Sequence, residues 1–333
     1  MADFQDIIGH QNIIRHFQSA IAQGKVGHAY ILNGPDRAGK RLLADAFAQT
    51  LQCESPEAKK TGSPCHACRS CKQAESGNNP DIINVLHEKP NTISVEDIRT
   101  QVVNTVDIKP YACAYKVYII DEAEKMNVQA QNALLKTIEE PPHYAVILLL
   151  TNNADLFLQT ILSRCVRLDL TAVADEVVRS FLMKQVRIPD YEADLCVAFA
   201  QGNVGKAITL ATSEDFHDIR ESVIDLMKCI HEMDLAELVA AVRRISDEKL
   251  VIQDYFDIMM IWFRDVLLYK ATKEIDALTF KDEIMEIKKQ ADRSTYQGLE
   301  AVIESIGKAK ARLQANVNFE LTLEMLLLTI KEA

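Results

Sequence analysis

An almost uninterrupted apolar run, AVILLLT at residues 145–151, constrains the fold of this chain more than any other segment. A strand without a polar face is buried on both sides, which is the position of a central strand in a parallel sheet. Helical segments separate this run from its neighbours, and a Ser94/Asp97 capping box opens the one that extends to about Val106. This alternation predicts βαβ units and an α/β fold. The other candidate strands are residues 28–33, 81–86, 116–121 and 165–170.

The C-terminal half is predicted to be helical. The last proline is Pro189, and only Gly298 and Gly307 follow Gly205. A stretch with so few helix breakers indicates packed helices. The chain therefore changes character between about residues 170 and 210. The candidate helices are 174–186, 192–201, one from about 205, 219–233, 235–245, 251–271, 280–294, 296–315 and 319–331.

The charge balance limits the possible partners. There are 37 Lys and Arg residues against 48 Asp and Glu, a net charge of −11. A chain this acidic does not grip nucleic acid with its whole surface, so any DNA contact needs a local patch or a partner. The sequence contains no uncharged apolar run of about 18 residues, so no membrane span is predicted. The N-terminus does not show the pattern of a signal peptide. The expected location is the cytoplasm.

A phosphate-binding loop is predicted between the first candidate strand and the following helix. The sequence GPDRAGKR matches the GxxxxGK pattern at Gly34, Gly39 and Lys40. In that pattern, backbone amides cradle phosphates and the lysine reaches the β- and γ-phosphate oxygens. The next position usually carries a hydroxyl that coordinates Mg²⁺, and here it is Arg41. Arg41, together with Arg37, either supplies positive charge without a metal or crowds the pocket.

A second nucleotide-site motif follows the third candidate strand. Asp121 and Glu122 come directly after the apolar residues 117–120. This is the Walker B arrangement, in which the aspartate holds the metal's water shell and the glutamate orients the attacking water. A site without its metal-binding hydroxyl should lose hydrolysis more than phosphate binding, because the metal neutralises charge that develops during the reaction.

Four cysteines form a separate motif. Cys53, Cys65, Cys68 and Cys71 follow a C-x11-C-x2-C-x2-C pattern. Cytosolic thiols stay reduced, which argues against a disulfide framework, and four thiolates make a closed tetrahedral zinc site. An iron–sulfur cluster is the competing interpretation. His66 lies between the ligands, and we expect a solvated loop histidine there, with a ligand role as the alternative.

With these residues in hand, the chain resembles the clamp-loader subunits of bacterial DNA polymerase III, a family of the AAA+ class, over essentially its whole length. The similar segments are FQDIIGH near the N-terminus, the zinc module at about 53–71, the EEPP run that begins at Glu139, Asn152 at the sensor 1 position and the SRC motif around Arg164. The resemblance implies an AAA+ domain at 1–170 with an inserted zinc module, a helical lid at 171–212 and an all-α collar at 213–333.

Two positions separate this chain from the ATP-hydrolysing members of that family. Arg41 replaces the metal-binding hydroxyl, and Gly205 stands where active subunits carry the sensor 2 arginine. Both substitutions are those of the delta-prime branch. The resemblance therefore implies a subunit that does not hydrolyse ATP itself, and it leaves ATP or ADP binding open.

The resemblance also assigns a role and partners. Arg164 is the family's arginine finger, which stabilises transition-state charge in a neighbouring subunit's site. The implied partners are gamma/tau and delta subunits in a pentameric ring, the sliding clamp and primer-template DNA. The chain would thus be a replication subunit of the DNA-directed DNA polymerase holoenzyme, a nucleotidyltransferase.

Two other functions remain open from the sequence. An active clamp-loader ATPase of the gamma/tau kind would tolerate Arg41 and show turnover as an isolated chain. A zinc-dependent nucleic-acid-binding protein would bind DNA tightly and in a salt-sensitive way, and the net charge of −11 speaks against it.

Overall fold

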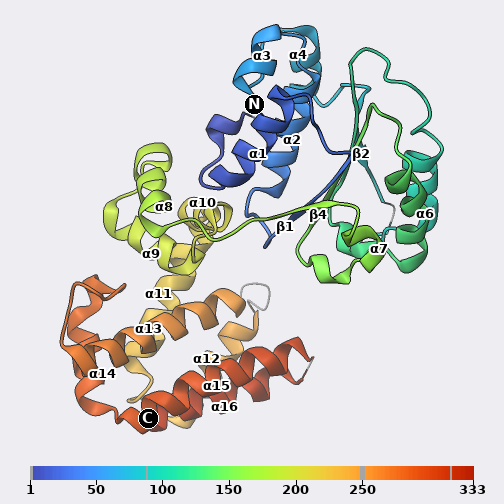
Figure 1. Ribbon diagram of the computed structural model, residues 1–333. Coiled ribbons are helices and arrows are strands. Elements are labelled where there is room, and N and C mark those ends of the chain that lie inside the picture. Colours follow the sequence, from blue (N-terminus) through green and yellow to red (C-terminus); the bar gives the residue numbers. More distant parts are fainter. Residues whose placement is uncertain (1–2, 88, 248–251, 316) are drawn as a thin grey trace. The chain divides into compact units, whose positions relative to one another are not determined.

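The computed structural model describes residues 3–87, 89–247, 252–315 and 317–333. Contacts divide the chain into two compact units (Figure 1). The first unit comprises Met1–Phe181 with Gln201–Lys206, and the second comprises Leu182–Ala200 with Ala207–Ala333. The three-part division with boundaries near 170 and 212 stays a prediction.

A five-stranded parallel sheet forms the centre of the first unit, with the strand order β2-β3-β4-β1-β5. The register of β1 and β4 runs from Ala29 opposite Ile147 to Asn33 opposite Thr151. The α/β class and all five predicted strands are confirmed. The strands are β1 (Ala29–Asn33), β2 (Ile82–Val85), β3 (Lys116–Ile120), β4 (Ala145–Thr151) and β5 (Val166–Asp169).

The strand order brings the carboxyl ends of β1, β3 and β4 together. β4 pairs with β1 on one side and with β3 on the other. Gly34, Asp121 and Asn152 are the residues that directly follow these strands. Parallel strands end at the same edge of a sheet, which is where open α/β folds bind ligands. Three segments far apart in the sequence therefore meet at one edge.

Helices cover both faces of this sheet (Figure 1). The core under α1 and α2 includes the stacked rings of Phe17 and Phe47, whose centroids are 4.2 Å apart. The core under α5, α6 and α7 includes Leu134 and Ile138, which are buried on the inner side of α6. The helices are α1 (Gln11–Ala22) and α2 (Lys40–Gln52) on one face, and α5 (Val95–Ile98), α6 (Val128–Glu139) and α7 (Gln159–Leu162) on the other.

The helix predicted to begin at Ser94 changes type in its second half. The capping box is present, because Ser94 Oγ accepts a hydrogen bond from Asp97 N and the Asp97 carboxylate accepts one from Ser94 N. A π-helical turn then covers Arg99–Val103. In this turn Gln101 donates to Leu86 O at 2.7 Å and accepts from Leu86 N at 2.9 Å. Gln101 thereby satisfies backbone groups just beyond the end of the edge strand β2.

Two short helices, α3 (Pro56–Thr61) and α4 (Arg69–Glu75), lie between α2 and β2. Cys71 lies on α4, Cys68 is its N-cap, Cys65 lies between α3 and α4, and Cys53 directly follows α2. The sequence analysis did not predict the two helices, because six or seven residues are too few to show a helical apolar period.

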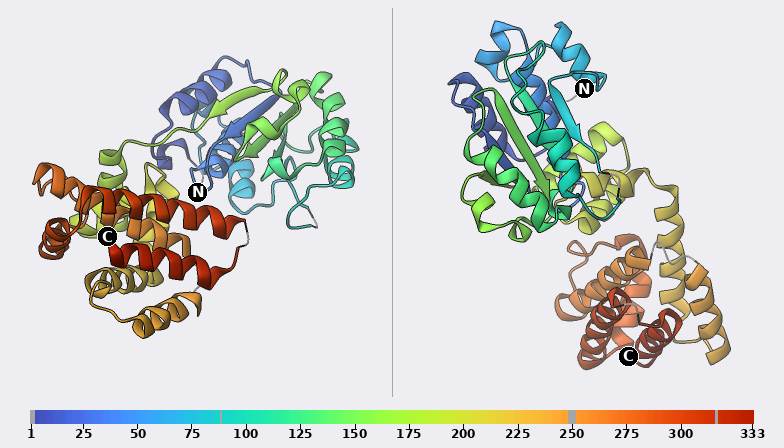
Figure 2. Two further views of the ribbon diagram at one scale, coloured as in Figure 1. Left: turned by 90° about the horizontal axis from the view of Figure 1, so that it is seen from below. Right: turned by 90° about the vertical axis from the view of Figure 1, so that its right-hand side faces the viewer.

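In the described residues of the second unit, all regular secondary structure is helical (Figure 2). The predicted helices are confirmed with small boundary changes, and one of them, 174–186, ends in a π-helical turn at Leu182–Val186. The predicted start of another helix at Val251 lies outside the described residues. The α-helices after the sheet are α8 (Asp175–Phe181), α9 (Asp190–Ala200), α10 (Val204–Thr212), α11 (Glu214–Cys229), α12 (Leu235–Asp247), α13 (Ile252–Thr272), α14 (Ile284–Arg293), α15 (Tyr296–Gln314) and α16 (Phe319–Glu332).

Helix α13 is the centre of the second unit. It packs against α11, α14 and α15. Its apolar residues surround most of its circumference, and Ile258, Met259, Ile261, Trp262 and Val266 are all buried. Core packing therefore accounts for this apolar excess. None of the helices in the described ranges combines the length and the apolar character that crossing a membrane requires.

A chain of polar contacts joins three helices and a connecting turn in this unit. Trp262 Nε1 donates to Gln290 Oε1 at 2.6 Å, and Gln290 Nε2 lies 3.2 Å from His231 Nε2. His231 Nδ1 lies 3.0 Å from Lys331 O. Because a carbonyl only accepts, Nδ1 carries the proton and Nε2 accepts from Gln290. Burial lowers the pKa of His231, and the positive charges of Arg293 and Lys331 lower it further, against the opposing effect of the Lys331 carbonyl.

We expect the second unit to lose stability as the pH falls below 6.5, the ordinary pKa of histidine. The unfolded chain binds a proton there before the folded protein does, so the free energy of unfolding decreases until the pH passes the lower, folded-state pKa. Unfolding followed by the fluorescence of Trp262, the sole tryptophan, measures this. His231→Gln should flatten the pH dependence, whereas His143→Gln, at an exposed position of the first unit, should retain it. An unchanged pH dependence in His231→Gln would contradict the assignment.

Candidate functional site

The predicted phosphate loop connects β1 to α2, as the sequence indicated. Gly39 caps the N-terminus of α2 with φ of 98°, a left-handed conformation that favours glycine. His10 lies beside the loop, with Nε2 3.1 Å from Ala38 O. Burial lowers the pKa of His10, against the opposing effect of that carbonyl.

Lys40 is turned inward onto the loop that carries it. Its side chain donates to Gly34 O at 2.6 Å, to Pro35 O at 2.9 Å and to Asn152 Oδ1. Lys40 is only 8% exposed, and this burial lowers its pKa against the opposing charges of nearby acids. A phosphate could bind Lys40 only by replacing acceptors that already satisfy it.

Asn152, the predicted sensor 1 residue, connects the loop to the Walker B segment. Its Nδ2 donates to Asp36 Oδ1 at 2.7 Å, and its backbone N–H donates to Glu124 Oε2 at 3.3 Å. Together with the contact to Lys40, these bonds engage both ends of the Asn152 amide. The structure thus brings Lys40 and Asn152 together and adds Asp36 and Glu124.

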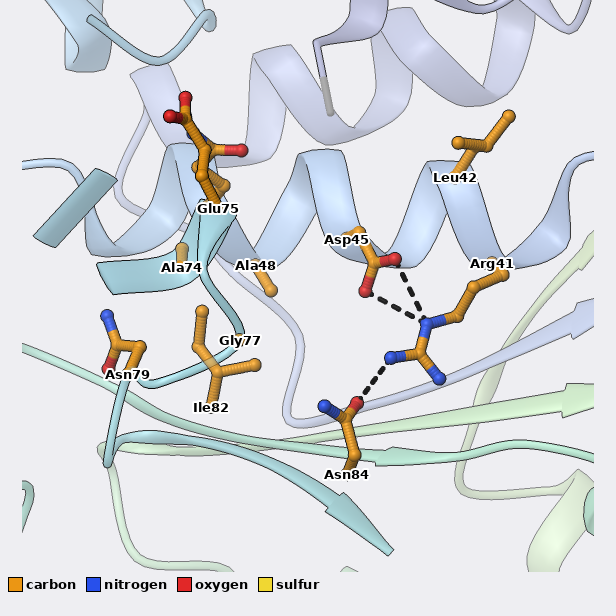
Figure 3. Close-up of a pocket in the computed structure, with 11 residues that line it drawn as sticks. Arg41, Leu42, Asp45, Ala48, Ala74, Glu75, Gly77, Asn79, Ile82 and Asn84 are labelled. Carbon is orange, nitrogen blue, oxygen red and sulfur yellow. Dashed lines mark hydrogen bonds and ion pairs between the residues drawn. The ribbon is translucent and has the colours of Figure 1, made fainter. Parts of the chain in front are cut away.

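Arg41 lies on the side of α2 that faces β2 and β3 (Figure 3). Its Nε lies 3.0 Å from both carboxylate oxygens of Asp45, and its Nη2 donates to Asn84 Oδ1 at 2.6 Å. Its Nη1 lies 3.7 Å from Asp121 Oδ2. Desolvation raises the pKa of Asp45 even though Arg41 opposes the shift. The guanidinium therefore occupies the space beside the aspartate that was predicted to hold the metal's water shell.

The predicted water-orienting glutamate has other partners. Glu122 adopts φ of 49°, and its Oε2 accepts from Lys125 Nζ at 2.7 Å. The same oxygen lies 3.6 Å from His87 Nε2. Glu122 is thus adjacent to Asp121 in the sequence, but its carboxylate pairs with Lys125, three residues further along the chain.

Gly205, at the predicted sensor 2 position, packs directly against the phosphate loop. A Cβ added to Gly205 would lie 2.2 Å from Arg37 O and 2.9 Å from Arg37 Cβ. Two residues earlier, Asn203 Nδ2 donates to Asp36 O at 2.7 Å. The backbone of the loop thus fills the space that any side chain at this position would need.

The four cysteines converge as the spacing predicted. Their Sγ atoms all lie within 4.8 Å of one another, and those of Cys65 and Cys71 are 4.0 Å apart. Four sulfurs at the usual Zn–S distance of about 2.3 Å would be separated by about 3.8 Å in a tetrahedron. Backbone amides also point at the sulfurs: Cys65 N donates to Cys53 Sγ, Cys68 N to Cys65 Sγ and Cys71 N to Cys68 Sγ, each at 3.4 Å.

The surroundings of these thiols favour thiolate at one position and thiol at two. Hydrogen bonds from the backbone amides of Ala67 and Cys68 lower the pKa of Cys65 to about 6. Burial raises the pKa of Cys53 and of Cys71. A metal ion that binds all four sulfurs would supply the positive charge that keeps the buried pair deprotonated.

His66 is outside the cysteine cluster. Its Nδ1 lies 2.7 Å from Glu75 Oε1, and its Nε2 lies 3.3 Å from Asp3 Oδ2. The contact with Glu75 is the main cause of a raised pKa at His66. The expected solvated loop histidine is therefore a partly buried one that joins the cysteine loop to α4 and to the N-terminus.

Arg164, the predicted arginine finger, lies between α7 and β5 with 39% of its side chain exposed. Its Nη1 donates to Thr160 O at 3.0 Å and to Ser163 Oγ at 3.1 Å. Its Nη2 lies 3.1 Å from Glu139 Oε1, at the end of α6. Three acceptors thus fix the orientation of this guanidinium within the chain.

A groove of about 350 Å³ lies beside the phosphate loop, between α2, α4 and β2 (Figure 3). Its polar walls include Asp45, which binds Arg41, and Glu75, which binds Gln49 at 3.1 Å. Neither Gly34 nor Lys40 lines it. Of the loop sequence only Arg41, at the start of α2, lines the groove.

The sequence analysis missed several residues of this site. Asp45 had a signal, since it lies four residues after Arg41 on one helix face. Asn84 had none, because its contact with Arg41 depends on how β2 packs. Glu139 was identified only as part of the EEPP run, and its contact with Arg164 was not predicted, because it depends on how α6 packs.

Comparison with known proteins identifies the family. The family model described as "DNA polymerase III, delta subunit" matches residues 9–174, and "DNA polymerase III, delta subunit, C terminal" matches residues 214–332. The DNA polymerase III subunit delta' of Bacillus subtilis is 30% identical over 328 residues, which cover 96% of this chain and 95% of that protein. The chain belongs to the clamp-loader subunit family of DNA polymerase III.

Relatives of this clamp-loader subunit include a second kind of subunit. DNA polymerase III subunit tau of Bacillus subtilis is 27% identical over 338 residues, covering 93% of this chain but 58% of tau. A solved structure, a DNA polymerase III gamma subunit-related protein from Thermotoga maritima, has a TM-score of 0.49 and 20% identity and covers 96% of this chain and 98% of that one. The parallel sheet with its loop, the cysteine cluster and the all-helical C-terminal region agree with the predicted AAA+ fold class.

Gly205→Ala should destabilise the first unit of this clamp-loader subunit by about 1–3 kcal/mol, because the new methyl group overlaps Arg37 O. Hydrogen exchange in the loop from Gly34 to Arg41 should become faster. Gly307→Ala is the matched control, since a Cβ at that helical position meets no atom within 4 Å. The control should be neutral or stabilising by up to about 1 kcal/mol. Unchanged exchange in Gly205→Ala would show that the loop moves aside at little cost.

Proposed function

We propose that this chain is a delta-prime-like, non-hydrolysing subunit of the DNA polymerase III clamp loader. The observation that carries the proposal is the position of Arg41, whose guanidinium lies between Asp45, Asn84 and Asp121. In hydrolysing P-loop proteins a hydroxyl at this sequence position and the Walker B aspartate hold Mg²⁺. Here the hydroxyl is absent and a side-chain cation already pairs with the aspartate.

Arg41 is a poor functional substitute for a metal ion. A guanidinium carries one positive charge, and in this structure part of that charge is neutralised by Asp45. Mg²⁺ bridges the β- and γ-phosphate oxygens and neutralises charge as it develops in the transition state. Arg41 could support binding of an anion near the loop, but it does not provide the bridging geometry. Weak ATP or ADP binding without turnover is the expected behaviour.

Gly205 supports the same proposal independently. An arginine at this position would need space that the loop backbone at Arg37 fills. Loss of the sensor 2 arginine would remove a positive charge from the γ-phosphate, on an element that is separate from Arg41. Two independent losses at one site fit a subunit whose ATPase activity is no longer required.

The alternative is an active ATPase of the gamma/tau kind. Lys40, Asp121, Glu122 and Asn152 are all present, and tau and gamma subunits are among the relatives. ATP turnover by the isolated chain that Asp121→Ala abolishes would support this alternative and overturn the proposed one. The zinc-dependent nucleic-acid-binding alternative gains no support from the fold, since the cysteine module is one part of a clamp-loader chain.

We also propose that Cys53, Cys65, Cys68 and Cys71 bind one structural zinc ion. The sulfur separations fit a tetrahedral ion, and amide hydrogen bonds to three sulfurs favour thiolates. Four protein ligands leave no position for water, so the ion would stabilise α3 and α4 and take no part in hydrolysis. It would contribute folding free energy to a module with few apolar residues.

The zinc proposal predicts one equivalent of Zn²⁺ per chain in reduced, freshly purified protein. Cys68→Ser should lose the metal and increase proteolysis or hydrogen exchange between residues 53 and 75, because the ligand set is incomplete. Cys229→Ser, outside the cluster, should keep the full equivalent. Metal analysis showing less than about half an equivalent in the wild-type protein would count against four-cysteine ligation.

As a partner, the chain would act in a ring of clamp-loader subunits of the gamma/tau and delta kinds. The helical second unit would serve as the collar, and Arg164 would act at a neighbour's nucleotide. The net charge of −11 fits a subunit that reaches primer-template DNA and the sliding clamp through the assembled complex. Such a complex would work on DNA in the cytoplasm.

The role of Arg164 is tested in the reconstituted complex. Arg164→Ala should leave zinc content, melting and assembly unchanged, because a surface substitution usually changes stability by less than about 0.5 kcal/mol. It should lower DNA- and clamp-stimulated ATP hydrolysis and slow clamp loading. The loss should be partial, since the other sites take their fingers from other subunits. Arg164→Lys should also be impaired, because an ammonium lacks the planar fork of the guanidinium. Unaltered loading by an assembled Arg164→Ala complex would leave the chain a structural ring member only.

A further inference from the structure

The carboxylate of Glu139 holds the guanidinium of Arg164. Glu139 Oε1 lies 3.1 Å from Arg164 Nη2. The two residues belong to different elements, since Glu139 ends α6 and Arg164 follows α7. Both side chains are partly exposed, at 44% and 39%. The contact therefore joins the end of a sheet-covering helix to a side chain at the surface.

Glu139 is badly placed for the helix that carries it. It is the last residue of α6, and Glu140 occupies the C-cap. The C-terminus of a helix carries partial negative charge, so a carboxylate there is unfavourable and a cation is favoured. A residue that violates a local preference in this way is often retained for a function. The positive charge of Arg164 compensates Glu139.

Among the residues that the structure describes, the hydrogen bonds of Arg164 engage Nη1 and leave Nε without an acceptor. A guanidinium has five N–H groups. Nη1 donates to Thr160 O and Ser163 Oγ, and Glu139 Oε1 forms an ion pair with Nη2 at 3.1 Å. In a guanidinium the Nε–H and one Nη2–H lie along one edge of the plane. That edge is the fork that binds two oxygens of a phosphate.

We propose that Glu139 is a positioning residue for Arg164, which it orients so that the Nε–Nη2 edge meets a phosphate across a subunit interface. This inference rests on the proposed role of Arg164 in a neighbour's site. A pair exposed to this degree contributes little to stability. Its contribution is the orientation of the guanidinium, which determines how well a planar fork fits phosphate oxygens.

The test compares reconstituted clamp-loader complexes that contain wild-type chain, Glu139→Ala, Glu139→Gln, Arg164→Ala or the Glu139→Ala/Arg164→Ala double variant. Glu140→Ala is the matched control, because Glu140 is the adjacent acid and makes no ion pair among the residues that the structure describes.

Glu139→Ala should lower kcat for DNA-stimulated ATP hydrolysis about threefold with KM changed less than about twofold, since orientation acts in the transition state. Glu139→Gln, which keeps an oxygen acceptor, should recover part of the loss. The control should match wild type.

The double variant separates positioning from structure. If Glu139 acts through Arg164, the double variant should be no slower than Arg164→Ala alone. A further loss in the double variant, or wild-type kcat in Glu139→Ala while Arg164→Ala is impaired, would overturn the positioning role. Wild-type activity in Arg164→Ala would instead overturn the proposed finger itself, and the positioning role with it.

Discussion

The guanidinium of Arg41 connects the elements that form the phosphate loop and the Walker B segment. It joins α2, through Asp45, to Asn84 on β2 and to Asp121 after β3. A hydroxyl at position 41 could not reach these groups, and a metal ion would need ligands that Arg41 now engages. The ion pairs and the hydrogen bond of Arg41 thus join three elements of the site within the chain.

The other polar groups at this edge of the sheet are satisfied within the chain as well. Lys40 donates to loop carbonyls and to Asn152, and Glu122 accepts from Lys125. Gly205 allows its backbone to approach Arg37 more closely than any side chain would permit. The side chains of Lys40, Asn152, Asp121 and Glu122 thus each have a partner within the chain.

The cysteine module is connected to this core by hydrogen bonds. Gln49 on α2 donates to Glu75 on α4, and Glu75 contacts His66 between the cysteines. These contacts pass along the groove between α2, α4 and β2. The module and the phosphate loop therefore share α2 as a common support, with Arg41 at its first turn and Cys53 directly after its last.

The sequence by itself determined the parallel sheet, the helical C-terminal half, the phosphate loop and the convergence of four cysteines. These follow from local signals, namely apolar runs, helix breakers and ligand spacing, that do not depend on distant residues. It also predicts that position 41 lacks a metal-binding hydroxyl, and the family resemblance implies that Gly205 replaces a sensor 2 arginine. The tertiary structure decided which groups occupy the vacated positions. Asn84, Asp121 and Glu139 reach their arginines only because the sheet order and helix packing bring together residues that lie 25 to 80 positions apart. No local pattern encodes such contacts, because they depend on the packing of whole elements.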